Sequence, residues 1–292
     1  MPELPDLEAY RHALAPRIVG QPLERVAIAH PFLLRTATPP IDAIAGRRVA
    51  EVRRVGKRIV LALDGGLFVV VHLMIAGRFQ WLAPGAKPPG RITLATFDFP
   101  AGRLALTEAG TKRRASLHVV DGERDLAALD PGGAEPLDCD LATFERLLAR
   151  ENHTLKRALT DPKTFAGIGN AYSDEILHRA KLSPLAQTAK LAPEDVARLY
   201  TAMREVLVEW TTRLRDEADR AFPSKVTAFR PEMAVHGRFG KPCPVCGAPV
   251  QRIVYAENEC NYCARCQTGG RILADRALSR LLKASFPRTL DG

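Results

Sequence analysis

Four cysteines near the end of the chain have the spacing of a metal site. Cys243, Cys246, Cys263 and Cys266 follow the pattern C-x2-C-x16-C-x2-C. A two-residue gap lets one tight turn present two thiolates to the same ion, and Zn²⁺ in structural sites takes four such ligands in a closed tetrahedron. The pattern therefore predicts one structural zinc ion, with no open coordination position for catalysis.

Two alternatives to this ligand set remain open at this point. The cysteines could form two disulfides, but Met1 is followed by proline and acidic residues rather than by a basic and then apolar leader, which favours a reducing cytoplasm. Cys260 and Cys263 also have C-x2-C spacing and could form the second pair instead. Cys139 is expected to be a free thiol, as is Cys260 if it binds no metal.

Composition points to a polyanionic partner. The 292 residues include 42 Lys and Arg against 33 Asp and Glu, a formal charge of +9. Such an excess favours nucleic acid, although a solvated basic surface would give the same balance. No apolar run approaches the roughly 20 residues that span a bilayer, so we expect a soluble cytoplasmic protein with no membrane partner.

The first part of the chain has a β texture after one short helix. Asp6 is expected to cap a helix that continues through Leu7 and Leu14 until Pro16 ends it. From residue 23 to about 120, short apolar or alternating runs are separated by Gly and Pro, which predicts a β-sandwich or barrel. Residues 130–140 are turn-rich and are interpreted as a linker.

The second part of the chain is helical. The clearest helix runs from residue 194 to 214, where apolar side chains recur at helical spacing and predict a core-facing stripe. That stripe consists of Val196, Leu199, Met203, Val206, Leu207, Trp210 and Leu214.

A glycine-containing turn precedes another predicted helix. Gly169 and Asn170 stand where one helix has ended near Asp161 and the next begins. Backbone N–H groups at a helix N-terminus bind phosphate, and Lys156 and Asn170 could add direct phosphate contacts. Glycines at such a turn more often only allow the chain to bend. The motif therefore supports phosphate binding only if other motifs in the chain agree with it.

The combined motifs resemble the formamidopyrimidine-DNA glycosylase and endonuclease VIII family. MPELPD at the start, the Gly56-Lys57 turn, GIGNAYSDE and the CPVC and CARCQ knuckles occur in the family's order, from Pro2 to about Gln267. The resemblance implies a multidomain α+β fold: an N-terminal β-sandwich with a leading helix, a helix-two-turn-helix domain and a zinc-finger β-hairpin. It also implies DNA bound in the cleft between the halves, by a monomer that needs no small-molecule cofactor.

The resemblance and the composition together give the expected domain limits. Residues 1–129 form the catalytic β-sandwich domain, 130–140 the linker and 141–235 the helix-two-turn-helix domain. Residues 236–275 form the zinc finger, and 276–292 a short basic tail.

The N-terminal residues carry the chemistry that this family implies. After removal of methionine, Pro2 has a secondary amine, and an α-amine with a pKa near 8 is partly neutral at pH 7. It can attack C1′ of the deoxyribose, expel the base and leave an iminium that drives elimination of the 3′ and then the 5′ phosphate. Glu3 matches the family's proton-handling carboxylate, and Lys57 its phosphate-contacting hairpin lysine.

The chain departs from the family where side chains fill the gap left by an extrahelical base. Ile75 stands at the position of the intercalating methionine, with Met74 beside it. Arg113 and Arg114 are retained in the second wedge loop, but Ala115 replaces the family's phenylalanine. These arginines could fill the void or bind phosphate, and the end of a basic hairpin is an equally good interpretation.

Further departures concern the lesion and the zinc finger. Residues 222–237 form a shorter segment than the one that closes over 8-oxoguanine, so oxidised pyrimidines, ring-opened purines or lesions in single strands become as plausible. Asn258 replaces an arginine that reaches the flanking phosphate, which removes a charge from that contact. Cys263 with Cys266 matches the family pairing and is preferred over Cys260 with Cys263.

Two functions of different classes follow from these residues. The first is a bifunctional glycosylase and abasic-site lyase of base excision repair, working on damaged or abasic DNA in the nucleoid. The second is a paralogue that binds damaged or branched DNA with little or no catalysis. The presence of Pro2, Glu3, Lys57 and Asn170 favours the enzyme.

Overall fold

The computed structural model describes residues 1–110, 112–255, 258–273 and 289–290. Within these ranges the chain divides into two compact units. Unit 1 comprises Met1–Pro131 and Glu209–Thr227, and unit 2 comprises Gly132–Val208 and the described part of Ala228–Gly292. The break after Pro131 falls inside the expected linker. The predicted tail at 276–292 lies outside the described residues apart from 289–290.

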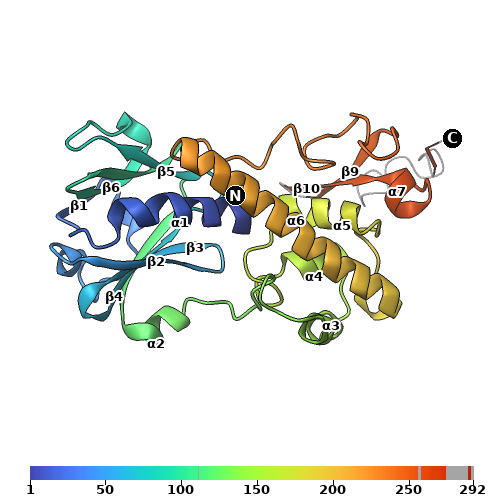
Figure 1. Cartoon of the computed structure of the whole chain (residues 1–292), viewed down its shortest axis with the longest axis horizontal. Helices are drawn as coiled ribbons and strands as arrows, with labels where there is room; N and C mark the ends of the chain where they lie inside the picture. Colours follow the sequence, from blue (N-terminus) through green and yellow to red (C-terminus); the bar gives the residue numbers. More distant parts are fainter. Residues whose placement is uncertain (111, 256–257, 274–288, 291–292) are drawn as a thin grey trace. The chain divides into compact units, whose positions relative to one another are not determined.

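Unit 1 is a sandwich of two antiparallel four-stranded sheets with a helix at its N-terminus (Figure 1). One sheet has the order β1-β6-β7-β5 and the other β2-β3-β4-β8. The bounds are α1 (Leu4–Ile18), β1 (Arg25–Ile28), β2 (Val49–Val55), β3 (Arg58–Leu63), β4 (Leu67–His72), β5 (Gly77–Leu82), β6 (Thr93–Phe99), β7 (Gly102–Glu108), β8 (Ser116–Asp121) and α2 (Gly122–Ala127). The β-sandwich predicted for residues 23–120 is confirmed.

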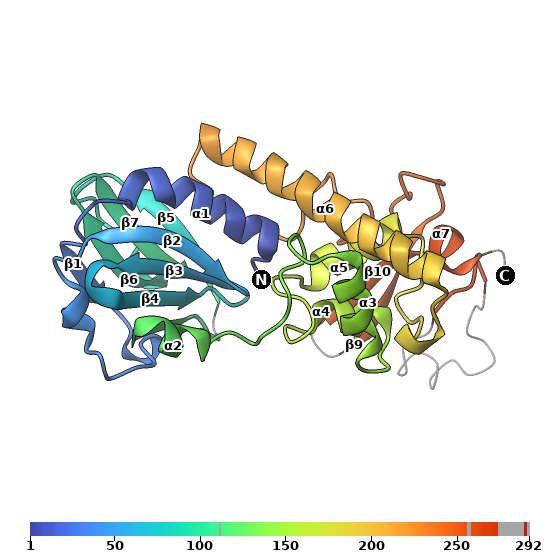
Figure 2. The ribbon, with the colours of Figure 1, turned by 60° about the horizontal axis from the view of Figure 1, so that its bottom comes forward.

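The main core of unit 1 lies between the two sheets and under α1. Alternate residues of the strands point inward, as the period of two requires. Phe97 and Leu106 of one sheet, Leu61 and Val69 of the other, and Tyr10 of α1 belong to one buried cluster. The opposite face of the β2-β3-β4-β8 sheet packs on α2 (Figure 2). Both faces of that sheet are therefore covered over part of its length, which explains the nearly continuous apolar run in β3.

The predicted bounds of the first helix were wrong at both ends. The helix begins at Leu4, with Glu3 at the N-cap position, and Asp6 lies one turn inside it. The Asp6 carboxylate accepts a hydrogen bond from the Glu3 N–H at 3.0 Å, so Asp6 supports the helix start without being the cap. Pro16 does not stop the helix, because a proline near the end removes only one N–H donor and the chain continues to Ile18.

Unit 2 contains the remaining helices and a two-stranded hairpin (Figure 1). Its elements are α3 (Leu141–Ala149), α4 (Leu155–Thr160), α5 (Asn170–Arg179), the first part of α6 (Pro193–Arg220), β9 (Val250–Tyr255), β10 (Asn258–Cys263) and α7 (Ala264–Thr268). The apolar stripe predicted on residues 194–214 is buried in α6 except at Val196, which is half-buried. The α6 residues from Glu209 onward belong to unit 1, where Leu214 packs against Ala9 and Ala13.

None of the helices in the described ranges combines the length and apolar character that crossing a bilayer requires.

Candidate functional site

The N-terminus of unit 1 is buried among charged groups. Glu3 is 3% exposed and Asp6 is 2% exposed. Burial lowers the pKa of the Met1 α-amine below its ordinary value of 8.0; the carboxylates of Glu3 and Asp6 oppose this, and the cations Arg78 and Lys57 add to it. The candidate carboxylate and the candidate lysine are therefore each within electrostatic reach of the terminal amine.

Lys57 occupies the tip of the hairpin between β2 and β3. Val55 pairs with Arg58 across a two-residue turn, and Gly56 has a φ of +55° that favours glycine. Arg54 supports the turn from within, because its guanidinium donates to the Gly56 carbonyl at 2.9 Å. Lys57 is half-buried, which limits the directions its ammonium can take.

Glu8 connects this hairpin to α1. Its carboxylate lies 3.0 Å from Arg54, 2.8 Å from Arg11 and 2.8 Å from Arg215 of α6. Burial alone would raise the pKa of Glu8, but the hydrogen bonds and charges of the arginines outweigh it and hold the pKa below its ordinary value. The helix that begins at the terminal amine and the turn that carries Lys57 are thus fixed to each other through one carboxylate.

The loop after β4 presents the predicted wedge residue. Ile75 is 56% exposed, and Met74 before it has a φ of +51°, in the left-handed region. His72 accepts a hydrogen bond from the Met74 N–H through Nδ1 at 3.1 Å. Burial first, and then the charges of Arg58, Lys57 and His118, lower the pKa of His72 to about 4. The imidazole is therefore neutral above that pH and can keep accepting the bond that shapes the loop.

The second predicted wedge loop is organised by a buried carboxylate. Glu108 is 1% exposed and accepts the N–H groups of Arg114 at 3.0 Å and Ala115 at 3.1 Å. The guanidinium of Arg113 contacts His30 and donates to the Arg91 carbonyl, the latter at 2.7 Å. Arg114 is exposed, whereas Ala115 is completely buried and cannot act as a wedge.

In unit 2 the glycine-containing turn opens α5, as predicted. Gly169 is the N-cap and Asn170 the first helical residue, whose side-chain amide donates to the Glu259 carbonyl of β10 at 2.8 Å. Lys156 lies beneath this turn rather than on its surface: it is 6% exposed, and its ammonium contacts Asp174 at 2.5 Å and the Asn170 carbonyl at 2.6 Å. This structure therefore gives Lys156 partners within the protein.

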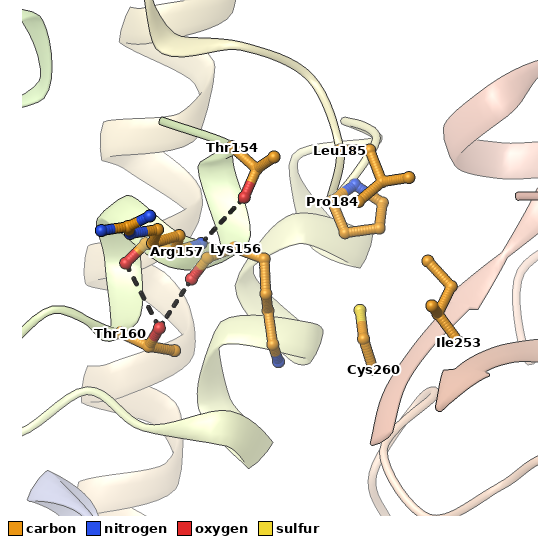
Figure 3. Close-up of a pocket in the computed structure, with 8 residues that line it drawn as sticks. All are labelled: Thr154, Lys156, Arg157, Thr160, Pro184, Leu185, Ile253 and Cys260. Carbon is orange, nitrogen blue, oxygen red and sulfur yellow. Dashed lines mark hydrogen bonds between the residues drawn. The ribbon is translucent and has the colours of Figure 1, made fainter. Parts of the chain in front are cut away.

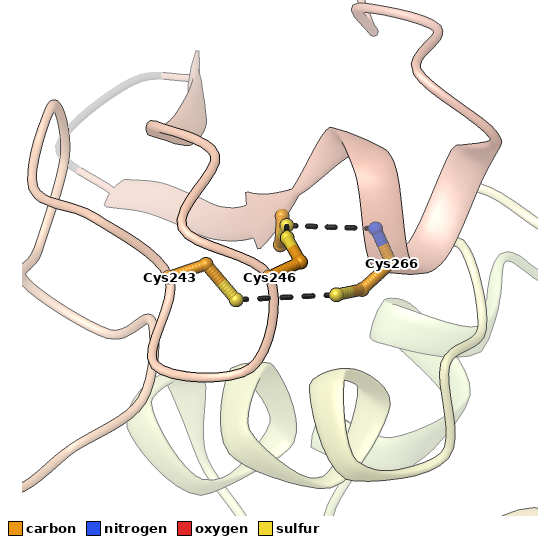
Figure 4. A group of neighbouring side chains, drawn as sticks. Cys243, Cys246 and Cys266 are labelled. Carbon is orange, nitrogen blue, oxygen red and sulfur yellow. Dashed lines mark hydrogen bonds between the residues drawn. The ribbon is translucent and has the colours of Figure 1, made fainter.

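The four predicted metal ligands form one cluster (Figure 4). The sulfurs of Cys243, Cys246, Cys263 and Cys266 all lie within 4.8 Å of one another. The Cys243–Cys266 sulfurs are 3.9 Å apart and those of Cys246–Cys263 3.4 Å, close to the roughly 3.8 Å between ligands of a tetrahedral zinc thiolate site. These residues would hold one structural Zn²⁺, which fixes the hairpin and supplies no open position for substrate.

The surroundings of the cluster agree with this donor set. Cys260 is 2% exposed and is not part of the cluster, which confirms the preferred pairing. His178 of α5 places Nε2 3.3 Å from the Cys243 sulfur, so an N–H there would donate to a thiolate ligand. Asn258 opens β10, but its side chain lies outside the described residues.

Comparisons with known proteins cover nearly the whole chain. Family models match at residues 1–117 (formamidopyrimidine-DNA glycosylase N-terminal domain), 132–214 (the H2TH domain of the same enzyme) and 240–269 (zinc finger found in FPG and IleRS). The formamidopyrimidine-DNA glycosylase of Thermus thermophilus is 37% identical over 279 residues, which cover 92% of this chain and 100% of that protein. The chain belongs to the formamidopyrimidine-DNA glycosylase family.

Solved structures of family members show the same fold. The crystal structure of MutM (Fpg) from Thermus thermophilus matches with a TM-score of 0.77 at 34% identity, covering 91% of this chain and 98% of that one. Lactococcus lactis Fpg, non-covalently bound to DNA containing an AP site, matches with a TM-score of 0.80 at 25% identity over 91% and 99% of the two chains. The resemblance inferred from the motifs is thereby confirmed.

Family motifs in the sequence did not point to every residue near the candidate site. Arg78 lies near the terminal amine and also donates to the Ile75 and Gly77 carbonyls, at 3.1 and 2.6 Å. Nothing in the sequence around Glu8 and Arg54 indicates that these two charges meet. An alternation pattern places Arg78 on a strand, but it does not show which charged groups that strand will meet, so no local signal could have found it.

Proposed function

We propose that this chain is a bifunctional DNA glycosylase and abasic-site lyase that removes oxidised or ring-opened bases and cuts the strand by β,δ-elimination. The observation that carries the proposal is the burial of Pro2 and Glu3 at the start of the chain, where the terminal amine is within electrostatic reach of Glu3 and Lys57. Zinc has a structural part only, since its four ligands close the coordination sphere. We propose that the protein acts as a monomer on DNA in the nucleoid.

The reaction begins once Met1 is removed and the Pro2 nitrogen becomes a secondary amine. That nitrogen attacks C1′, and the bond from C1′ to the base breaks with the electron pair leaving on the base. Glu3 handles the protons of the sugar ring oxygen and the leaving group. Opening of the sugar ring gives an iminium between Pro2 and C1′.

The iminium then acts as an electron sink. Loss of a C2′ proton expels the 3′ phosphate, loss of a C4′ proton then expels the 5′ phosphate, and hydrolysis of the iminium by water returns the Pro2 amine. Lys57, on the turn fixed by Arg54, binds the phosphate beside the lesion through its positive charge. Extrusion of the damaged nucleotide costs a few kcal/mol and is easiest where pairing is already weakened.

DNA contacts are proposed for each unit separately. In unit 1, exposed Ile75 enters the gap left by the extruded nucleotide, and Arg113 and Arg114 lie on the second wedge loop. In unit 2, the N–H groups at Gly169 and the amide of Asn170 bind backbone phosphate, as helix N-termini do.

Two residues proposed in the sequence as phosphate contacts in unit 2 have weaker support. The ammonium of Lys156 already contacts Asp174 and the Asn170 carbonyl, so we propose that it supports the turn from beneath. Asn258 adds an uncharged hydrogen bond in the proposal, and nothing in the described residues bears on it.

Borohydride trapping tests the covalent step. The methionine-processed protein, verified by mass spectrometry, is incubated with abasic-site DNA in single- and double-stranded forms, beside the matched form that retains Met1. We expect an adduct on Pro2, located by peptide mass mapping, only with the processed protein, because in the form that retains Met1 the Pro2 nitrogen is an amide and cannot form the iminium. No adduct with intact DNA binding would refute the lyase and favour a DNA-binding paralogue.

A Glu3→Gln variant separates the two activities. It should slow base excision more than cleavage of a preformed abasic site, which has no base to expel. An equal loss of both activities would contradict the assigned proton-handling role.

A further inference from the structure

Asp174 joins three separate segments of unit 2. It is on α5, one turn after Asn170, and its side chain is completely buried. Oδ1 accepts from the Lys156 ammonium of α4 at 2.5 Å. Oδ2 lies 2.8 Å from His236 Nδ1 and accepts the Asn261 N–H of β10 at 3.0 Å. One carboxylate thus holds α4, the segment before the first zinc knuckle and the zinc hairpin.

Side chains of α4 and of the zinc hairpin line a common space next to the Lys156–Asp174 ion pair. A cavity of about 290 Å³ lies there, and its lining includes Lys156 and Arg157 of α4 and Ile253 and Cys260 of the hairpin (Figure 3). The lysine side chain extends along the helix side of this space, with the Cys260 thiol across from it. The hydrogen bonds and ion pair of Asp174 therefore hold α4 and the hairpin together, as side-chain packing would in a filled core.

The same network contacts both the backbone carbonyl and the side-chain amide of Asn170. Lys156, paired with Asp174, donates to the Asn170 carbonyl at 2.6 Å. The Asn170 side-chain amide donates to the Glu259 carbonyl at 2.8 Å, two residues before the Asn261 N–H that Asp174 holds. One amide hydrogen and the amide oxygen of Asn170 have no part in that bond and can meet a ligand.

The neighbouring carboxylate provides a contrast. Glu175 is also buried, and it accepts the N–H groups of Ala234, Val235 and His236 at 2.7 to 2.9 Å. It holds the segment before the zinc knuckle by its backbone. Within the part of the chain that the structure describes, Glu175 makes no hydrogen bond to β10, Lys156 or Asn170, so it shares a structural role with Asp174 but not the connection to the turn.

We propose that Asp174 is a positioning residue that sets the direction of the Asn170 amide toward a DNA phosphate. This rests on the proposed function, in which Asn170 binds the DNA backbone. Neutralising Asp174 removes the charged partner of Lys156 and weakens the attachment of the β10 strand that supplies the Glu259 acceptor. Asn170 then keeps its chemistry but loses its fixed orientation, and the phosphate contact loses its preorganisation.

A double-mutant cycle tests the proposal. Dissociation constants for duplex DNA containing a tetrahydrofuran abasic analogue are measured by fluorescence anisotropy for wild type, Asn170→Ala, Asp174→Asn and the double variant. We expect each single change to weaken binding about tenfold and the double change about tenfold as well, instead of a hundredfold. The coupling is then about 1.4 kcal/mol, the equivalent of a tenfold change.

Glu175→Gln is the matched control. It removes a buried charge one position along the same helix, so a purely structural effect should be similar for both carboxylates. In the Glu175→Gln background, Asn170→Ala should still cost its full tenfold. Zinc content is measured for every variant, so that loss of the metal is not mistaken for loss of positioning.

The outcomes are distinguishable. The positioning role would be overturned if the affinity losses of Asn170→Ala and Asp174→Asn multiplied in the double variant. Equal coupling between Asn170→Ala and Glu175→Gln would overturn it too, as would an Asn170→Ala variant that binds DNA with wild-type affinity. Wild-type protein that binds no DNA would overturn the proposed function and this inference with it. If Asp174→Asn does not fold, His236→Gln, which leaves the Lys156 ion pair in place, must show a smaller loss that is again not multiplicative with Asn170→Ala.

Discussion

Replacing Glu8 by glutamine should destabilise unit 1 by about 2 kcal/mol at neutral pH. The carboxylate is 11% exposed and accepts from three arginines, of which Arg54 is equally buried at 10%. Hydrogen bonds to charged groups contribute about 1.5–3 kcal/mol each. Glutamine keeps one acceptor oxygen and no longer has a buried charge to desolvate, which brings the net loss to the lower part of that range.

The pH dependence gives the sharper test. The pKa of Glu8 in the folded protein is below its ordinary value of 4.5, so the stability it contributes is fully present above that value. That contribution is lost as the pH falls toward the folded pKa, where protonated glutamate and glutamine become equivalent. The difference between wild type and Glu8→Gln should therefore be constant from pH 7 to about 5.5 and shrink below pH 4.5.

Urea unfolding followed by circular dichroism at several pH values measures this difference. Glu51→Gln is the control, because Glu51 pairs with Arg53 at an exposed site and should change the free energy of unfolding by less than about 1 kcal/mol. A Glu8→Gln cost that matches the Glu51→Gln cost at pH 7, or that does not change below pH 4.5, would refute the reasoning.

Three further perturbations have defined outcomes. Glu108→Gln should loosen the loop that ends at Arg114 and Ala115, costing about 1–2 kcal/mol and speeding tryptic cleavage there; an unchanged cleavage rate would contradict the role of the carboxylate. Cys243→Ser should release the zinc, measured by metal analysis, and weaken DNA binding, and retention of one equivalent would count against the ligand set. Burial raises the pKa of the Cys260 thiol well above its ordinary value, so iodoacetamide should alkylate Cys260 at least about tenfold more slowly in the native protein than in urea; equal rates would show the thiol to be accessible.

How far the sequence could predict the site depended on how local each contact is. The zinc ligands lie in two pairs with fixed spacing, so short-range geometry was enough to predict their cluster. Lys57 was named only through the family resemblance, although the two-residue turn that carries it is local. The contacts of Asp174 join it to His236 and Asn261, 62 and 87 residues away, and no periodicity encodes such a distance. The prediction that Lys156 contacts phosphate did not foresee its nearby carboxylate partner, because charge type alone does not reveal burial.

The first helix shows the same limit on a smaller scale. The sequence offers Asp6 as a cap, since Asp is a favoured N-cap residue and Glu is not. Packing of Leu4 in the core and the reach of the Asp6 carboxylate back to the Glu3 N–H moved the helix start three residues earlier than a cap at Asp6 allows. Tertiary burial decided the boundary over local preference.

Glu175 accepts hydrogen bonds from three successive backbone N–H groups, which affects how the sequence of residues 234–236 can diverge. Every residue except proline offers the same N–H, so this contact cannot distinguish one side chain from another at positions 234–236. Packing and the imidazole of His236 limit which side chains these positions accept. The hydrogen bonds from the backbone to Glu175 do not depend on the side chains and persist when these are replaced. A homologue could therefore lose all recognisable similarity across these positions and still be fastened in the same way.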